Sequence, residues 1–214
     1  MTTSSANVRS PQQERSRLTR ERLLRSTVDV LAVDGWAAAT VAAVAERAGV
    51  SRGAAQHHFP TREALITAAL EQVFEDLTRA AGVDPTPSSE PVDEVTANQV
   101  TPARIVRAVQ RAVDVYTGTE FKAALQVWAA AASDPALRRM ILPLEAKFAR
   151  AAHQRTMAAM GVSPDDETGF RLVQATLDMA RGLGLADTLS DDSARRALVV
   201  DTWSAQLVAA LGSD

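Results

Sequence analysis

The sequence predicts an all-α protein of about nine helices. Alanine and other good helix formers are abundant, whereas Phe, Tyr and Trp together make up only 4% of the 214 residues. Alternating β-branched runs, which are typical of strands, are missing. Apolar residues recur at helical spacing in almost every segment. The length suits one large domain or two small ones.

Cap and turn residues place the boundaries of the expected helices. Gly35 and Gly49 end the first two helices, because glycine adopts the left-handed conformation of a helix C-terminus at little cost. Thr40 and Ser51 are the expected N-caps of the second and third helices, and Pro60 breaks the third. The expected helices cover residues 18–34, 41–48, 52–58, 102–117, 120–132, 135–160, 164–187 and 191–211, with a fourth helix that carries Leu65, Ala69, Leu70, Val73, Phe74 and Leu77.

A loop is expected over residues 82–102, where proline, serine and acidic residues cluster without periodicity. No apolar run reaches the roughly 18 residues of a membrane span. The polar, arginine-rich N-terminus lacks the pattern of an export signal. We therefore expect a cytoplasmic protein with no membrane partner. The absence of cysteine excludes disulfides, thiolate zinc sites and cysteine nucleophiles, and no metal site is expected.

Charge is distributed unevenly along the chain. Residues 1–62 hold nine arginines against five acidic residues, a net charge of +4, although the whole chain carries −3. A basic N-terminal segment on an acidic remainder suggests that this segment binds a polyanion. A solvated arginine-rich tail would give the same charge pattern. The charge therefore indicates polyanion binding only if the fold presents a suitable binding surface.

Residues 40–59 are predicted to form such a binding surface. Two short helices joined by a tight glycine turn, with longer helices on both sides, match the helix-turn-helix plan that places one helix in the DNA major groove. Gly49 suits the left-handed turn residue, and Val50 can fill the small core between the short helices. Ser51 can cap the second short helix, and its hydroxyl and the free N–H groups beside it can meet phosphate.

Arg52 and Gln56 are candidate base-reading residues on the exposed face of this helix. Arginine pairs with guanine and glutamine with adenine, each such contact discriminating by roughly 1–3 kcal/mol. Gly53 and Ala54 are small enough to let the helix approach DNA closely. An ordinary solvated helix face is the alternative interpretation of these polar residues.

This stretch resembles the DNA-binding domain of the TetR (tetracycline repressor) family of bacterial regulators. The resemblance is carried, within residues 18–65, by Thr40, the run from Ala45 through Gly49-Val50-Ser51-Arg52-Gly53, the His57-His58-Phe59 ending and Arg62. It implies a homodimer that binds a near-palindromic double-stranded DNA operator near the nucleoid, usually as a repressor released by a small-molecule ligand. The implied division is a flexible basic arm at residues 1–17, a helix-turn-helix domain at 18–64 with its recognition helix at about 51–58, and a helical effector-binding and dimerisation domain at 65–214.

The resemblance also implies individual roles in DNA binding. The residues at positions that usually touch phosphate are Thr40, Ser51, His57 and Arg62, and those on the recognition surface are Arg52, Gly53, Ala54 and Gln56. The family commonly has Leu-Tyr where this chain has Ala55-Gln56, which puts the usual tyrosine phosphate contact in doubt. His58 is expected either to pack against the fourth helix or to contact phosphate, and Phe59 is expected in the core.

The arginines near the start of the first expected helix offer a further contact with DNA. Arg9, Arg15, Arg17 and Arg20 either form an arm that reaches along a DNA groove or belong to a tail with general attraction for phosphate.

The last two expected helices carry apolar stripes suited to a dimer interface. Pairing both helices with those of a symmetry mate would form a four-helix bundle. The candidate interface residues are Phe170, Val173, Leu177, Val200, Trp203 and Leu207. An intrachain position for the tryptophan is the alternative.

Aromatic and methionine side chains in the middle helices are candidates for the wall of an apolar effector pocket, with plain core as the alternative. The candidate pocket residues, including three polar ones, are Phe121, Leu125, Trp128, Phe148, His153, Met157, Asp178, Met179 and Arg181. No resident cofactor is expected, and nothing in the sequence identifies the effector.

Two other classes of function are considered. An enzyme is disfavoured because no nucleophile elbow, phosphate loop or HExxH motif is present. His57 and His58 do not form a metal-binding pair either, because adjacent residues point about 100° apart on a helix and cannot both face one ion. The second alternative, a helical adaptor that binds only protein, does not explain the basic helix-turn-helix surface.

Overall fold

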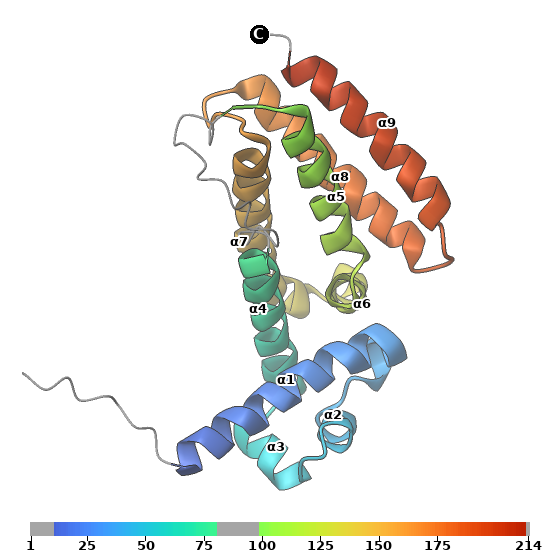
Figure 1. Ribbon diagram of the computed structural model, residues 1–214. Helices are drawn as coiled ribbons and strands as arrows, with labels where there is room; N and C mark the ends of the chain where they lie inside the picture. The colour runs from blue at the N-terminus through green and yellow to red at the C-terminus, as the bar shows by residue number, and fades with distance from the viewer. Residues whose placement is uncertain (1–10, 81–98, 213–214) are drawn as a thin grey trace, which may run out of the picture.

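The computed structural model describes residues 11–80 and 99–212, and these residues form nine α-helices and no strand, as the sequence predicts (Figure 1). The helices are α1 (Pro11–Ala38), α2 (Val41–Arg47), α3 (Arg52–His58), α4 (Arg62–Ala80), α5 (Pro102–Thr117), α6 (Thr119–Ser133), α7 (Pro135–Met160), α8 (Glu167–Asp187) and α9 (Ser193–Leu211).

The helices form a small N-terminal unit and a larger helical body. Helices α1, α2 and α3 gather at one end of the molecule, and α4 rises from them along α7 (Figure 1). In the body, α5 packs against α7, α8 and α9, and α6 lies between this group and α1. The contact between α1 and α6 therefore joins the two parts, together with α4.

Helix α1 begins earlier than the sequence analysis expects. It starts at Pro11 and not at residue 18, so residues 11–17 are helical, whereas residues 1–10 of the expected flexible arm, with Arg9, lie outside the described residues. Proline is favoured at the first position of a helix. Arg17 also pairs with both Glu14 and Glu21, one helical turn away on either side, which supports these first turns.

The expected stop at Gly35 is confirmed. Gly35 has a φ of 82°, which interrupts the helical backbone between the main part of α1 and the short turn that ends at Ala38. This conformation is accessible to glycine at little cost.

Side-chain caps set several other helix starts. Asp166 accepts a hydrogen bond from the Gly169 amide at 2.9 Å, so α8 begins at Glu167 and not at residue 164. Thr101 caps α5 in the same way through the Arg104 amide. Most of the expected loop over 82–102 lies outside the described residues.

One close helix contact fixes the centre of the body. Gly184 of α8 is buried against the end of α5, and a Cβ atom at this position would overlap the carbonyl oxygen of Tyr116. The Tyr116 ring meets Phe121 edge-on with centroids 5.2 Å apart, and Phe148 stacks on Phe74 at 4.7 Å. Glycine at this point therefore lets α8 lie directly on the α5 backbone beside an aromatic core.

Candidate nucleic-acid interface and apolar pocket

The turn between α2 and α3 has the geometry that its sequence predicts. Thr40 Oγ1 accepts a hydrogen bond from the Ala43 amide at 3.1 Å, and Ser51 Oγ accepts one from the Ala54 amide at 3.2 Å. Gly49 adopts a φ of 62° between the two helices. Val50 is half-buried and packs on the core. Each short helix is thus started by a side-chain cap, and the turn places α3 on the outside of the unit.

Helix α3 has one buried side and one open side. Ala55 and the following Phe59 are buried in the core, and Ala54 is half-buried. The exposed residues of α3 are Arg52, Gly53, Gln56 and His57. They lie at i, i+1, i+4 and i+5, which is one face of a helix. The predicted recognition surface is therefore a contiguous, solvent-facing strip.

Gly53 has no internal reason to be glycine. Its backbone is helical, and a Cβ atom added there would meet nothing within 4 Å. Glycine inside a helix costs roughly 0.5–1 kcal/mol relative to alanine. The absence of a side chain at this exposed position leaves the α3 backbone open to the approach of another molecule.

Arg62 serves the interior of the protein, unlike the other residues that the resemblance assigns to DNA. Its Nε donates to the Ala39 carbonyl at 2.8 Å, its Nη2 donates to the Trp36 carbonyl, and its guanidinium carbon lies 4.0 Å from the centre of a Trp36 ring. The guanidinium thus ties the start of α4 to the end of α1. Two of the five N–H groups of Arg62 are thus used within the chain, and its expected contact with phosphate through the others stays a prediction.

His58 faces a hollow between the end of α3 and the first turns of α1. The residues that line the hollow are Gln12, Gln13, Ser16, Arg17, Arg20 and His58. Partial burial lowers the pKa of His58, and the charges of His57 and Arg20 lower it further. The sequence analysis missed that Arg20 and His58 line the same hollow, because the two residues are far apart in the chain.

The predicted pocket residues do not line one common pocket, although several of them contact each other. Phe121 packs edge-on against Trp128, and His153 Nε2 lies 3.0 Å from the Phe170 carbonyl oxygen. Arg181 pairs with Glu145 and Asp178. Of the nine candidates, Phe148 alone lines the pocket that the described residues enclose between α5, α7 and α8.

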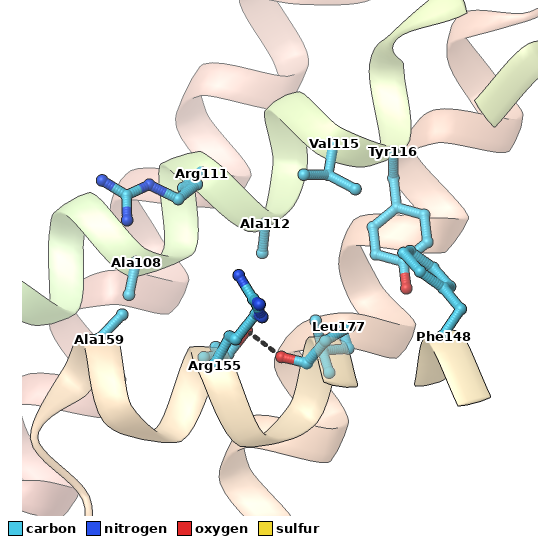
Figure 2. Close-up of a pocket in the computed structure, with 11 residues that line it drawn as sticks. Ala108, Arg111, Ala112, Val115, Tyr116, Phe148, Arg155, Ala159 and Leu177 are labelled. Atoms are coloured by element: carbon cyan, nitrogen blue, oxygen red, sulfur yellow. Dashed lines mark hydrogen bonds between the residues drawn. The ribbon is translucent and has the colours of Figure 1, made fainter. Parts of the chain in front are cut away.

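The pocket observed there is narrow and mainly apolar (Figure 2). Its free space is about 40 Å³, enough for a few water molecules. The residues that line it are Ala108, Arg111, Ala112, Val115, Tyr116, Phe148, Ala152, Arg155, Thr156, Ala159 and Leu177. Burial raises the pKa of Tyr116, so its phenol stays neutral and keeps its proton. The sequence analysis missed both arginines, because nothing local distinguishes them from surface residues.

Most of the predicted dimer residues face the inside of the protomer. Val173, Leu177, Val200 and Leu207 are buried in its core, and Trp203 Nε1 donates to Thr176 Oγ1 at 2.9 Å. The four buried residues pack within the protomer, which corrects their assignment to an interface, whereas Trp203 is half-buried and its interface role stays a prediction. Phe170 remains open, with an exposed fraction of 49%. The other large apolar side chains exposed on α8, α9 and their connection are Leu185, Leu189 and Leu198.

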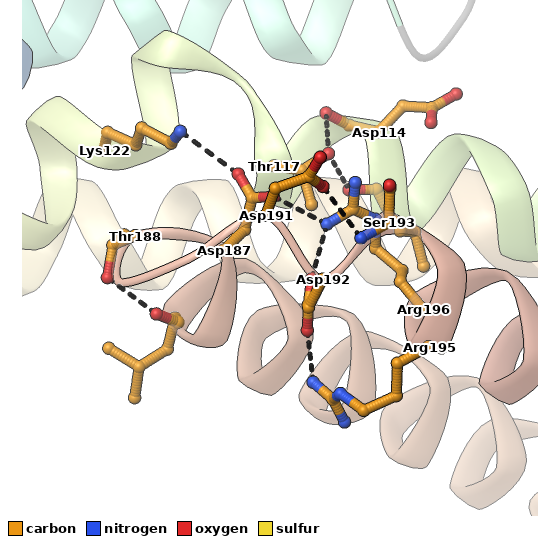
Figure 3. Close-up of polar contacts among 12 residues, drawn as sticks. Asp114, Thr117, Lys122, Asp187, Thr188, Asp191, Asp192, Ser193, Arg195 and Arg196 are labelled. Carbon is orange, nitrogen blue, oxygen red and sulfur yellow. Dashed lines mark hydrogen bonds and ion pairs between the residues drawn. The ribbon is translucent and has the colours of Figure 1, made fainter.

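A network of charges fastens the α8–α9 turn to α6 (Figure 3). Asp187 accepts from Lys122 of α6 at 3.1 Å and from Arg196 of α9 at 2.7 Å. Arg196 and Lys122 lower the pKa of Asp187 through these contacts. Arg196 also pairs with Asp192 at 2.9 Å. The turn is thereby held to the helix that contacts α1.

Within residues 11–80 and 99–212, no helix is long and apolar enough to cross a membrane. The same residues contain no group of three or more His, Cys, Asp or Glu side chains arranged to hold a metal ion.

Comparison with known proteins identifies related sequences and folds. Residues 23–69 match the family model described as bacterial regulatory proteins, tetR family. The chain is 33% identical over 133 residues to the HTH-type transcriptional regulator CymR of Pseudomonas putida, covering 62% of this chain and 61% of CymR. It is 32% identical over 122 residues to the regulator BetI of Stenotrophomonas maltophilia, covering 56% and 58%. The matched part thus spans about three fifths of these curated relatives.

The fold is shared over the whole length. The structure of Salmonella enterica GusR superposes with a TM-score of 0.62 at 18% identity, covering 97% of this chain and 100% of GusR. At this identity the likeness concerns the fold alone.

Proposed function

Because this chain belongs to the TetR family of bacterial regulatory proteins, we propose that it is a sequence-specific DNA-binding transcriptional regulator that works as a ligand-responsive homodimeric repressor. The observation that carries the proposal is the open face of α3, where Gly53 leaves room for a neighbour that the chain itself does not supply. This function places the protein at the nucleoid.

Helix α3 enters the major groove with its exposed strip toward the bases. Arg52 and Gln56 reach base edges, and Gly53 and Ala54 keep the helix close to them. Thr40, Ser51 and His57 lie on the same outer side and contact phosphates. Arg20 and His58 add a second backbone contact where α1 passes the end of α3.

Two copies pair through the outer faces of α8 and α9. The exposed side chains of Phe170, Leu185, Leu189 and Leu198 supply apolar surface there. Pairing two such helices from each protomer gives a four-helix interface with two-fold symmetry. The symmetry sets the two α3 helices about 34–36 Å apart, one turn of DNA, so the operator is near-palindromic.

An effector in the pocket between α5, α7 and α8 changes this spacing. Tyr116 and Phe121 link the pocket to α6, and α6 packs on α1. Such couplings between a ligand site and a DNA site amount to about 1–3 kcal/mol. The effector therefore lowers operator affinity by favouring a dimer with a different separation of its α3 helices.

Selection of binding sites from random duplex DNA tests the proposal. We expect the full chain to recover a near-palindromic site, with affinity that falls steeply as salt rises. Arg52→Ala and Gln56→Ala are each expected to cost about 1–3 kcal/mol of discrimination at one base pair. Arg139→Ala, at an exposed position of α7, is the matched control. An unchanged sequence preference in both α3 variants, or a monomer in sedimentation, would refute the assignment.

A further inference from the structure

The pocket between α5, α7 and α8 has an unbalanced charge. Two arginines, Arg111 of α5 and Arg155 of α7, line it, and no acidic residue among the described ones does. Arg155 also lines the neighbouring groove between α4 and α7, where Glu71, Glu75 and Lys147 lie. Arg155 thus stands between this groove and the pocket, and on the pocket side no described wall residue carries a carboxylate.

Arg155 is half-buried and has no hydrogen-bond or ion-pair partner within the described residues. Arg104 donates to the carbonyls of Ala159 and Gln99, and Arg196 pairs with Asp187. No acceptor within the described part of the chain lies at hydrogen-bond or ion-pair distance from Arg155. Figure 2 shows its side chain rising from α7 toward α5, near Ala112. A partly desolvated guanidinium with unused donors is a ready binding group for an anion.

The remaining walls select an apolar body. Phe148 and Leu177 close one end of the space, and short alanine side chains border the rest. Thr156 donates its hydroxyl to the Ala152 carbonyl at 2.8 Å, so it offers no free donor. Tyr116 accepts from Arg181 at 3.4 Å, and its own phenolic proton is available to an acceptor. The donors on offer are thus the Arg155 guanidinium and the Tyr116 phenol, whereas Thr156 can only accept, and these groups border an apolar space.

We propose that this pocket binds a small carboxylic acid with an apolar body, whose carboxylate pairs with Arg155 and whose body lies against Phe148 and Leu177. The proposal rests on the proposed function, since it names the chemical class of the effector. Arg111 adds positive charge at the rim. The present free space of about 40 Å³ is smaller than such a molecule, so binding moves the Arg155 side chain and widens the gap between α5 and α7. The same movement gives the effector a means to shift α5 and, through it, α6.

Matched ligands test the charge requirement on the unaltered full chain. Benzoate, phenylacetate and hexanoate are compared by titration calorimetry with their neutral amides, and benzoate also with benzamidine, its positively charged isostere. At least one acid is expected to bind at least about tenfold more tightly than its amide, because a charge-assisted hydrogen bond is lost in the amide. Benzamidine is expected not to bind. Equal binding of acid and amide, or no binding of any acid at millimolar concentration, would overturn the proposal.

A variant pair tests the residue. Arg155→Gln is expected to weaken the acid at least about tenfold and to leave the weak binding of the amide in place. Arg150→Gln makes the same charge change at an exposed position of α7 and is expected to bind the acid as the unaltered chain does. Acid binding that survives Arg155→Gln refutes the anchor. Circular dichroism checks folding of the variant, and if it fails to fold, the acid–amide comparison still decides the matter.

DNA binding is measured separately, so the two proposals fail independently. If the chain selects an operator but binds none of the acids, the proposed regulatory function stands and the proposed carboxylate site is refuted. If the chain binds an acid through Arg155 but selects no DNA sequence, the proposed carboxylate site stands and the proposed regulatory function is refuted.

Discussion

The outer face of α3 and the pocket of the body contrast in how they are built. The α3 face comes from seven consecutive residues, started by one cap and preceded by one glycine turn. The pocket is assembled from three helices of 16, 26 and 21 residues that are distant in the chain. A local segment can present a surface by itself, whereas a pocket needs the whole packing of the body.

Two helical glycines show the same contrast. A Cβ on Gly53 would meet only open space, but a Cβ on Gly184 would overlap the Tyr116 carbonyl. Gly184 therefore serves the fold, whereas no contact within the described residues requires glycine at position 53, where we propose a close approach to DNA. The following predictions test this distinction, beginning with the largest effect.

Gly184→Ala is expected to destabilise the protein by about 3 kcal/mol, because the added methyl group forces α8 away from the α5 backbone. Urea unfolding measures the loss. Gly182→Ala, at an exposed position of the same helix with nothing within 4 Å, serves as the control and is expected to stabilise slightly. Equal effects of the two changes would contradict the account of the α5–α8 contact.

Arg62→Gln is expected to lower stability by about 2 kcal/mol, because the Trp36 and Ala39 carbonyls lose a charged donor. Arg52→Gln removes the same charge from an exposed position and is expected to leave stability unchanged. The salt dependence of DNA binding separates the two roles further. A lower salt slope for Arg62→Gln at full stability would show that Arg62 also contacts phosphate.

Asp187→Asn is expected to cost up to about 1 kcal/mol at neutral pH, because it weakens the contacts of α6 and α9 at the α8–α9 turn. The lowered pKa of Asp187 gives the effect a pH dependence. The stabilisation is present above the unfolded-state pKa of about 3.9 and is lost as the pH falls through the lower folded-state pKa. Unfolding curves of variant and unaltered protein should therefore converge in acid, and a constant difference would argue against the carboxylate.

Gly53→Ala is expected to have the smallest effect on stability, a gain of about 0.5 kcal/mol, because alanine favours the helix and meets no neighbour. The same change is expected to weaken operator binding, since its methyl group points toward the DNA. Thermal unfolding and a binding titration measure the two effects. Tighter or unchanged DNA binding would mean that the glycine does not serve close approach.

The sequence predicted the α2–α3 unit closely because its determinants are local. Thr40, Gly49 and Ser51 act on backbone groups within a few residues, so their effect can be worked out without knowing the rest of the fold. The first helix was predicted too short, because the ion pairs of Arg17 outweigh the polar character of its first turns.

The larger body was predicted less well for a physical reason. The apolar stripe of α8, with Val173 and Leu177, identifies a buried face but not the neighbour that buries it, and α5 covers it within the protomer. Arg111 and Arg155 meet only through tertiary packing. Helical periodicity therefore predicts burial, and pairing between distant helices determines the site.

The straight part of α1 is a long rigid helix that connects α6 with the neighbourhood of α3. From Pro11 to Asp34 it is about 36 Å long at 1.5 Å per residue. Just past its C-terminal end, the amide of Trp36 lies 3.4 Å from Gln126 Oε1 of α6, and its other end lies beside His58. A tilt of about 5° at the α6 end displaces the far end by about 3 Å over this length. A tilt of α1 at α6 would therefore move the end of α1 that lies beside α3 more than the end that lies at α6.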